Sequence, residues 1–338
     1  MAQIDLGGGT TVRTFPAPPR GFDPMTAGPA ELSKYGFPSR PEDAEQLNSY
    51  NRLFGLMKNN FTYIEPTFEV NPGRRHITSS SHERSTGRIA PDVAPVTEVS
   101  PIWSGAAVFP PAGQSFRWIA GDWTIPNLHK VATTGQTYHC DIWIGIDGDP
   151  SVASQDLCQV GVQMNVTQHG DALSLNCSAF CGWYPGPEAT MNLPVTFGDT
   201  VSAVICTTGA GATEATIFMR NLTQGVATSF ILHAGMYSNG SPVSLVGDSA
   251  LWVVGRPIIG PATSLLADYV QLFFSGAVAV SYSPDGSISQ VADGGTQTYI
   301  NMRYTFITPA PGVLSYGVLV APQVVECIFA DSGSIDPL

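Results

Sequence analysis

The stretch WIGIDGDPSVASQDLCQVGVQ, residues 143–163, decides the fold because apolar and polar side chains alternate on both sides of its central turn. Before the turn and at its start, the more polar side of the alternation holds His139, Asp141, Trp143, Gly145 and Asp147. Beyond the turn, the polar set is Gln159, Gly161, Gln163 and Asn165. Successive side chains of a β-strand point to opposite faces, so the pattern predicts two strands, each with one buried and one polar face. The polar face is either a solvent-exposed exterior or a functional site.

Short strands of this kind run from about residue 100 to the end of the sequence. Many apolar or alternating segments are separated by turn residues, and no helical periodicity lies between them. Parallel strands need crossover connections, usually helices, which this part of the sequence lacks. We therefore predict that residues 100–338 form one all-β domain, an antiparallel β-sandwich.

The first 99 residues have a different composition and are predicted to form an N-terminal arm. Residues 1–40 are rich in Pro and Gly and are expected to be extended or loosely packed. Residues 71–88 are polar and basic, which indicates a linker or a strap. A helix is predicted near 41–58, because Pro41 suits a first helical turn and apolar residues follow at helical spacing. These apolar residues are Leu47, Tyr50, Leu53, Phe54 and Met57.

Charge is sparse and unevenly distributed along the chain. Charged residues make up 12% of the 338, about half the ~25% of an ordinary domain. The net charge is −12, and residues 101–338 hold five Lys or Arg against sixteen Asp or Glu. Such a body fits a protein that tolerates acid, and it fits equally a plain acidic surface. The basic stretch from 74 to 88 is a candidate cover for the acidic sandwich, and protonation of the carboxylates should loosen it.

The sequence argues against several classes of partner. No basic patch is present to neutralise phosphates, so no nucleic acid is expected. No apolar run approaches the ~20 residues that span a bilayer, and no signal peptide is visible, which leaves a secreted or extracytoplasmic location open. The six cysteines allow many pairings, and without paired CxxC motifs we expect no metal and no cofactor. The oligomeric state is not indicated.

Five segments resemble segments of the glutamic peptidases, also called eqolisins, and follow one another along the chain in the same order as in that family. WIGIDGD followed by LCQVG is similar to the segment that carries the catalytic glutamine of that family. Residues 21–41 also resemble a leader that many bacterial relatives carry. The joint occurrence is specific, whereas any one string alone is weak. The remaining matching segments are 103–126, CGWYPG at 181–186, ALWVVGRP at 250–257 and LADYVQLFF at 266–274.

The resemblance implies a sandwich of two curved antiparallel sheets with a groove across one concave face. In active members a glutamate and a glutamine project from neighbouring strands into this groove. The glutamate takes a proton from the water that attacks the peptide carbonyl, and the glutamine amide donates to the developing oxyanion. The implied ligand is therefore an extended polypeptide.

Carried over position by position, the catalytic glutamine is Gln159, while Leu251 occupies the position of the catalytic glutamate. Gly182 and Gly255 fall where the family has two further acids. The resemblance also implies that a set of residues around these positions binds the substrate. This set is Trp143, Asp147, Asp149, Gly182, Tyr184 and Trp252.

A leucine neither accepts a proton nor orders a water, and loss of a general base costs about 10²–10⁴-fold in rate. We therefore expect a catalytically impaired, glutamic-peptidase-like sandwich, a pseudoenzyme, whose groove still binds an extended polypeptide. One alternative is an active acid endopeptidase that uses Gln159 with a substitute carboxylate such as Asp147. Another is a non-enzymatic sandwich that binds carbohydrate or serves a structural role. Whether the protein is an enzyme stays open at this point.

Overall fold

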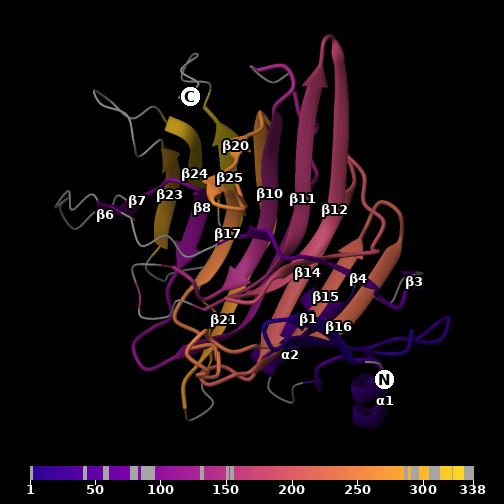
Figure 1. Cartoon of the computed structure of the whole chain (residues 1–338). Coiled ribbons are helices and arrows are strands. Elements are labelled where there is room, and N and C mark those ends of the chain that lie inside the picture. The colour runs from indigo at the N-terminus through magenta and orange to yellow at the C-terminus, as the bar shows by residue number, and fades with distance from the viewer. Residues whose placement is uncertain are drawn as a thin grey trace.

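The computed structural model of the chain consists almost entirely of antiparallel strands arranged in two packed layers (Figure 1). It describes residues 3–40, 44–55, 61–76, 83–84, 96–129, 133–149, 152, 156–284, 288–290, 297–303, 313–321 and 323–330. The predicted antiparallel β-sandwich is confirmed. No helix of the described residues is long and apolar enough to cross a membrane.

The first layer contains the strands that were predicted on either side of the central turn. Each of its neighbours pairs antiparallel with the next one along the sheet. In spatial order the strands are β4 (Phe68–Asn71), β13 (Glu188–Met191), β12 (Ala172–Tyr184), β11 (Leu157–His169), β10 (Thr137–Ile146), β17 (Ala250–Gly255), β8 (Trp103–Val108) and β23 (Gln297–Arg303). Beyond them, β23 also pairs in parallel with β7 (Val96–Ser100), which pairs with β6 (Glu83–Arg84).

The second layer continues from the first through β23 and β24, so the sheet folds over onto itself. Its strands are β24 (Val313–Ala321), β25 (Val324–Phe329), β21 (Gln271–Tyr282), β9 (Ser115–Thr124), β14 (Thr200–Thr207), β15 (Glu214–Asn221), β16 (Val226–His233), β2 (Thr10–Thr14) and β1 (Gln3–Gly7). Short pairings add β3 (Thr62–Tyr63) and β22 (Ile288–Gln290) to the second layer, whereas β20 (Leu265–Leu266) pairs with β10 of the first layer.

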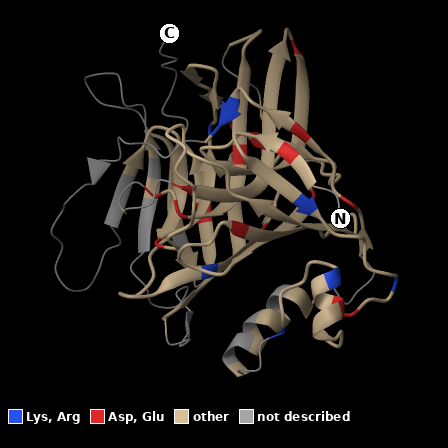
Figure 2. Cartoon of the chain, turned by 60° about the horizontal axis from the view of Figure 1, so that its bottom comes forward, with Lys and Arg blue, Asp and Glu red and all other residues tan. Residues whose placement is uncertain are grey.

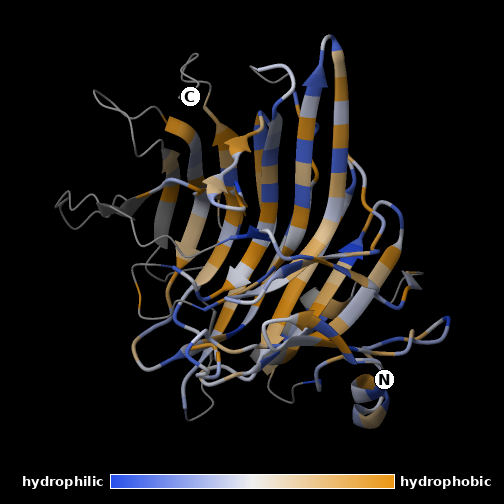
Figure 3. Cartoon of the chain, viewed as in Figure 1, coloured by the Kyte–Doolittle hydropathy of each residue, from blue (hydrophilic) through white to orange (hydrophobic). Residues whose placement is uncertain are grey.

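The main core lies between the two layers, where β10 and β11 pack against β14. The apolar set of the alternation supplies it: Ile142 and Ile144 of β10 and Val160 of β11 are fully buried. Figure 3 shows the alternation directly, as hydrophilic and hydrophobic bands along β10, β11 and β12. One face of the first layer is therefore committed to the core, and its polar set points to the opposite, outer face.

The N-terminal residues cover the outer face of the second layer. Helix α1 (Pro29–Lys34) and helix α2 (Ala44–Phe54) lie beside the strands (Figure 2). Tyr50 and Phe54 of α2 are fully buried, and Phe54 packs edge-to-face on Trp118 and on Phe218. The predicted helix is thus present over 44–54, while 41–43 and 56–58 lie outside the described residues.

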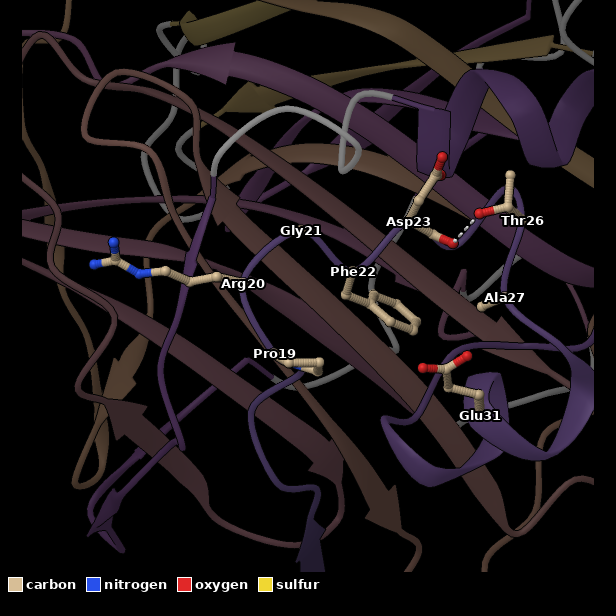
Figure 4. A pocket seen from close by; sticks show the side chains of 8 residues that line it. All are labelled: Pro19, Arg20, Gly21, Phe22, Asp23, Thr26, Ala27 and Glu31. Atoms are coloured by element: carbon tan, nitrogen blue, oxygen red, sulfur yellow. Dashed lines mark hydrogen bonds between the residues drawn. The ribbon is translucent and has the colours of Figure 1, made fainter.

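Residues 3–40 are more ordered than their Pro and Gly content suggested. The hairpin β1–β2 adds to the second layer at β16, and α1 was not among the sequence predictions. Before α1 the chain makes a tight turn in which Asp23 accepts hydrogen bonds from the Met25 N–H and the Thr26 hydroxyl. Figure 4 shows this turn and the shallow, open pocket beside Glu31. The pairing of β2 with β16 and the packing of arm residues such as Leu32 on the second layer attach residues 3–40 to the sandwich, against the expectation of a loosely packed arm.

Candidate active site

Three residues of adjacent strands lie in one row across the outer face of the first layer. Gln159 on β11 is directly opposite Gly145 on β10, and Gly145 is directly opposite Leu251 on β17. Directly paired residues share a face, so Gln159 and Leu251 point the same way on either side of a glycine. Leu251 is fully buried in an apolar cluster with Trp143 and Val253. The leucine thus stands two strands from the glutamine, with only a glycine between them.

The polar set predicted from the alternation is buried, although it lies on an outer face. Asp141 is 0% exposed, Gln159 is 1% exposed and Gln163 is 8% exposed. We call this surface the Gln159 face. Buried polar groups at these levels need partners, because burial without a hydrogen bond costs about 1–3 kcal/mol per group. The face is therefore a covered site rather than a solvent-exposed exterior.

Residues 74–76 of the N-terminal arm form the cover, and we call them the strap. The chain reaches the face by β4, which pairs with β13 at the edge of the first layer. It then turns into β5 (Arg74–Arg75), which pairs with β18 (Ile258–Ile259), and β18 also pairs with β19 (Ala262–Thr263). His76 follows and is 1% exposed. Two pairings with the sandwich thus place an extended piece of the chain over the Gln159 face.

Four charged groups meet under the strap. Arg74 Nη2 donates to both carboxylate oxygens of Asp141, at 2.5 and 2.6 Å. His76 Nε2 lies 3.0 Å from Asp141 Oδ2, and His76 Nδ1 lies 2.7 Å from Glu188 Oε1. The backbone N–H of His76 also donates to Glu188 Oε1, at 2.6 Å. Two cations from the strap therefore balance two carboxylates of the sandwich.

The charges of this group reinforce one another. Burial disfavours the imidazolium of His76, but the charge of Glu188 and the contacts with Asp141 outweigh burial and raise the pKa of His76 to about 9. Burial likewise opposes ionisation of Asp141, yet Arg74 and His76 hold the pKa of that carboxyl below its usual value. His139 is the exception, because burial and the nearby Arg74 lower its pKa to about 4. At neutral pH His76 is cationic, Asp141 is anionic and His139 is neutral.

Glu188 is the functional residue that the sequence reasoning missed. The side-chain amide of Gln159 donates from Nε2 to Glu188 Oε1 at 3.2 Å. Glu188 lies on β13 directly opposite Gly182 of β12, which is itself opposite Gln159. A Cβ at Gly182 would lie 3.0 Å from Glu188 Cγ and 3.5 Å from Gln159 Nε2. The absence of a side chain at Gly182 thus leaves room for the contact between glutamine and carboxylate.

A signal for Glu188 was present in the sequence. The segment CGWYPGPEAT places a Pro-Gly-Pro turn between Gly182 and Glu188, and such a turn favours a hairpin. A hairpin returns the acid to the strand position opposite the glycine. Asp147, the substitute acid expected from the sequence, is instead close to Gln159 along the chain and not on the strand that pairs with β12.

Asp147 and Asp149 lie away from Gln159, at the turn after β10. The carboxylate of Asp147 accepts hydrogen bonds from the backbone N–H groups of Val246, Gly247 and Asp248. Burial and the charge of Asp248 raise the pKa of Asp147 to about 7 against these hydrogen bonds. Asp149 is buried, and its N–H lies 3.4 Å from the Ser249 hydroxyl. The structure therefore does not bring Asp147, the expected substitute base, together with the glutamine.

The aromatic residues predicted to line the site divide between the two faces. Trp143 lies on the Gln159 face, with its ring 5.7 Å from His76, and Tyr184 packs at the edge of the same apolar cluster. Trp252 points the other way: it belongs to the main core and donates from Nε1 to the Ala120 carbonyl at 2.9 Å. Trp252 therefore does not lie on the Gln159 face as expected, because strand alternation puts it on the opposite side of β17 from Leu251.

The described residues hold no cluster of His, Cys, Asp and Glu that is arranged for a metal ion. The six cysteines are free thiols, and burial raises the pKa of the Cys181 thiol, so they contribute no nucleophile here. The chemistry available on the Gln159 face is therefore that of the Gln159 and Gln163 amides, two carboxylates and the strap's cations.

The two-layered sandwich, with a glutamine beside a carboxylate on one outer face, defines a glutamic-peptidase-like protein. Residues 101–308 match the Peptidase A4 family, and the chain belongs to that family. Its fold is similar to scytalido-glutamic peptidase in complex with a transition-state analogue inhibitor, at 19% identity and TM-score 0.50, covering 68% of this chain and 99% of that one.

Two further solved structures are similar to parts of the chain. SCP-B, a member of the eqolisin family in complex with the tripeptide Ala-Ile-His, is 17% identical over 68% of this chain and 99% of its own, with TM-score 0.45. Aspergilloglutamic peptidase from Aspergillus niger is 21% identical over 57% of this chain and 99% of its own, with TM-score 0.41. No curated protein matches the sequence significantly.

Proposed function

We propose that the Gln159 face is a groove for an extended polypeptide and that hydrolysis by the family's glutamate–glutamine pair is lost. The observation that supports binding is the strap itself: residues 74–76 cross the face as extended backbone, paired with β18. The observation that supports loss of hydrolysis is Leu251, whose buried apolar side chain stands across Gly145 from Gln159. Without the general base we expect about 10²–10⁴-fold less activity than in a complete site.

Two measurements test this proposal. The purified chain is incubated with an unfolded protein at pH 2–4, and we expect no cleavage above background. Leu251→Glu restores the carboxylate, alone and together with Gly182→Glu, and we expect cleavage to appear in at least the single variant. Gly182→Glu adds a side chain where Glu188 already lies. Comparing the double variant with Leu251→Glu alone therefore also reports whether cleavage requires that space to stay open for Glu188. A correctly folded Leu251→Glu protein with no activity would contradict the claim that the rest of the site is preserved.

A second candidate function is acid peptidase activity with Glu188 in place of the missing glutamate. Its support is the 3.2 Å contact between Gln159 Nε2 and Glu188 Oε1. Once the strap is displaced, Glu188 can take the proton of a water while the Gln159 amide donates to the oxyanion of the attacked carbonyl. The carboxylate would then act from β13, on the opposite side of the glutamine from β17.

The same digestion separates the two candidates. Cleavage by the unmodified chain at pH 2–4, abolished by both Gln159→Ala and Glu188→Gln, would establish the second function. Leu251→Ala is the matched control, because the second function does not use that side chain. Cleavage that survives Glu188→Gln would instead point to contamination or to another acid.

A further inference from the structure

The carboxylates of the Gln159 face are arranged for a cation. Asp141 and Glu188 are 0% and 2% exposed, and their ion pairs among the described residues are with Arg74 and His76 of the strap. An ionised carboxylate buried without a partner costs several kcal/mol, so the sandwich needs a positive group at this place. Neutral peptide backbone alone cannot supply it.

The walls of the same place select a flat cation. The imidazole of His76 stacks on Phe180, with ring centroids 5.8 Å apart at 28°, and it is tilted against Trp143 at 5.7 Å. On its third side it meets Gly255, where a Cβ would lie 3.3 Å from His76 Cδ2. Planar imidazolium and guanidinium groups fit between aromatic faces, whereas a compact, strongly hydrated ammonium gains less there.

Several buried polar atoms of the face are without a hydrogen-bond partner among the described residues even with the strap in place. Among them are the amide oxygen Oε1 of Gln159 and the indole nitrogen Nε1 of Trp143. Both residues are at most 1% exposed. Native structures satisfy nearly all such groups, so a free acceptor and a free donor indicate that the face is built for a ligand with more polar contacts than the strap makes.

We propose that Asp141, Glu188, Trp143 and Phe180 form a subsite that takes an arginine or histidine side chain of an extended polypeptide. Arg74 and His76 are its internal ligand, and an external peptide of the same kind displaces them. This inference rests on the proposed polypeptide-binding function and specifies the class of peptide that is bound.

The test uses the full chain with Arg74→Ala and His76→Ala, which frees the subsite, and calorimetric titration at pH 6. The probe is an acetylated, amidated octapeptide with the chain's own sequence 71–78, NPGRRHIT. The matched control peptide is NPGQQNIT, which has the same length and no cation. We expect the basic peptide to bind the variant at least about 10-fold more tightly than the control peptide does. We also expect it to bind the unmodified chain more weakly, because the strap competes.

Adding Asp141→Asn to the freed chain should remove most of the preference for the basic peptide. Equal binding of the two peptides would overturn the cation subsite and leave polypeptide binding intact. Binding of neither peptide to a folded variant would overturn the proposed function as well. Near-ultraviolet circular dichroism of the tryptophans checks the fold, and Arg74→Gln with His76→Gln replaces the first variant if that one does not fold.

Discussion

Raising the pH from 6.5 to 9.5 should release the strap. His76 has a pKa of about 9 in the docked state, against its ordinary 6.5. A group whose pKa is raised by docking stabilises the docked state fully below 6.5, and this stabilisation is lost as the pH rises through 9. The difference corresponds to about 3 kcal/mol, so the fraction of undocked strap should rise roughly 100-fold across this interval.

Trypsin measures the undocked fraction, because the bonds after Arg74 and Arg75 are cut only when the strap leaves the sheet with β18. The cleavage rate at these two bonds is followed by mass spectrometry and divided by the rate for an unstructured reference peptide at each pH. His76→Phe is the control: it keeps an aromatic ring between Trp143 and Phe180 but does not titrate. Asp147, with its pKa of about 7, titrates in both proteins and cancels in the comparison.

We expect a steep rise with pH for the unmodified chain and a high, flat rate for His76→Phe. A normalised rate that stays constant between pH 6.5 and 9.5 in the unmodified chain would refute the assigned charge state of His76. An equal rise in both proteins would place the titrating group elsewhere.

Three further predictions concern low pH, a fully buried aromatic side chain, and a glycine where two strands come into close backbone contact. Docking of the strap lowers the pKa of Asp141, so the ionised carboxylate stabilises the docked strap above its ordinary pKa of about 4, and this stabilisation is lost as the pH falls through the lowered value. Hydrogen exchange at residues 74–76, corrected for the intrinsic rate, should therefore be faster at pH 2 than at pH 5. Unchanged protection of these amides would contradict the prediction. Phe54→Ala empties a fully buried site and should lower the free energy of unfolding by about 3–5 kcal/mol, measured in urea, with an exposed residue such as Leu175→Ala as the control. Gly161→Ala places a Cβ 2.0 Å from the Ile142 carbonyl oxygen and should prevent native folding, so a soluble variant with unchanged stability would show that the pairing of β10 with β11 differs.

The sequence predicted the sandwich strands and the face on which Gln159 lies for one physical reason, while the resemblance alone placed Leu251 on a neighbouring strand. A strand has a period of two, so the alternation around Trp143 fixes which side chains share a face, independently of distant contacts. By the same rule Trp252 faces away from its neighbour Leu251, so its predicted place in the site rested on the resemblance alone. Where the alternation was followed, as for Gln159, the side chain lies on the expected face.

Other features depended on contacts that no local pattern records. Asp147 follows the alternation of β10, but its own backbone has φ 65°, and the turn directs its carboxylate to the backbone of 246–248. The docking of the strap involves three residues, too few for a periodic signal, and only the charge contrast between arm and sandwich suggested it. Residues 21–40 are rich in turn residues, yet their aromatic side chains pack on the outer face of the second layer.

Gly182 and Gly255, which the resemblance aligns with two acids of the family, fit together in one arrangement of the site. Gly255 leaves the space that the imidazole of His76 fills, and Gly182 leaves the space that the side chain of Glu188 fills. An acid at either position would bring another negative charge beside two buried carboxylates, and it would exclude the group that now lies there. The glycines therefore favour a state in which the strap is docked and its cations are paired. The Leu251→Glu variant keeps the strap docked over the site. Its hydrolytic activity should therefore increase further when His76→Ala is added and removes the internal ligand.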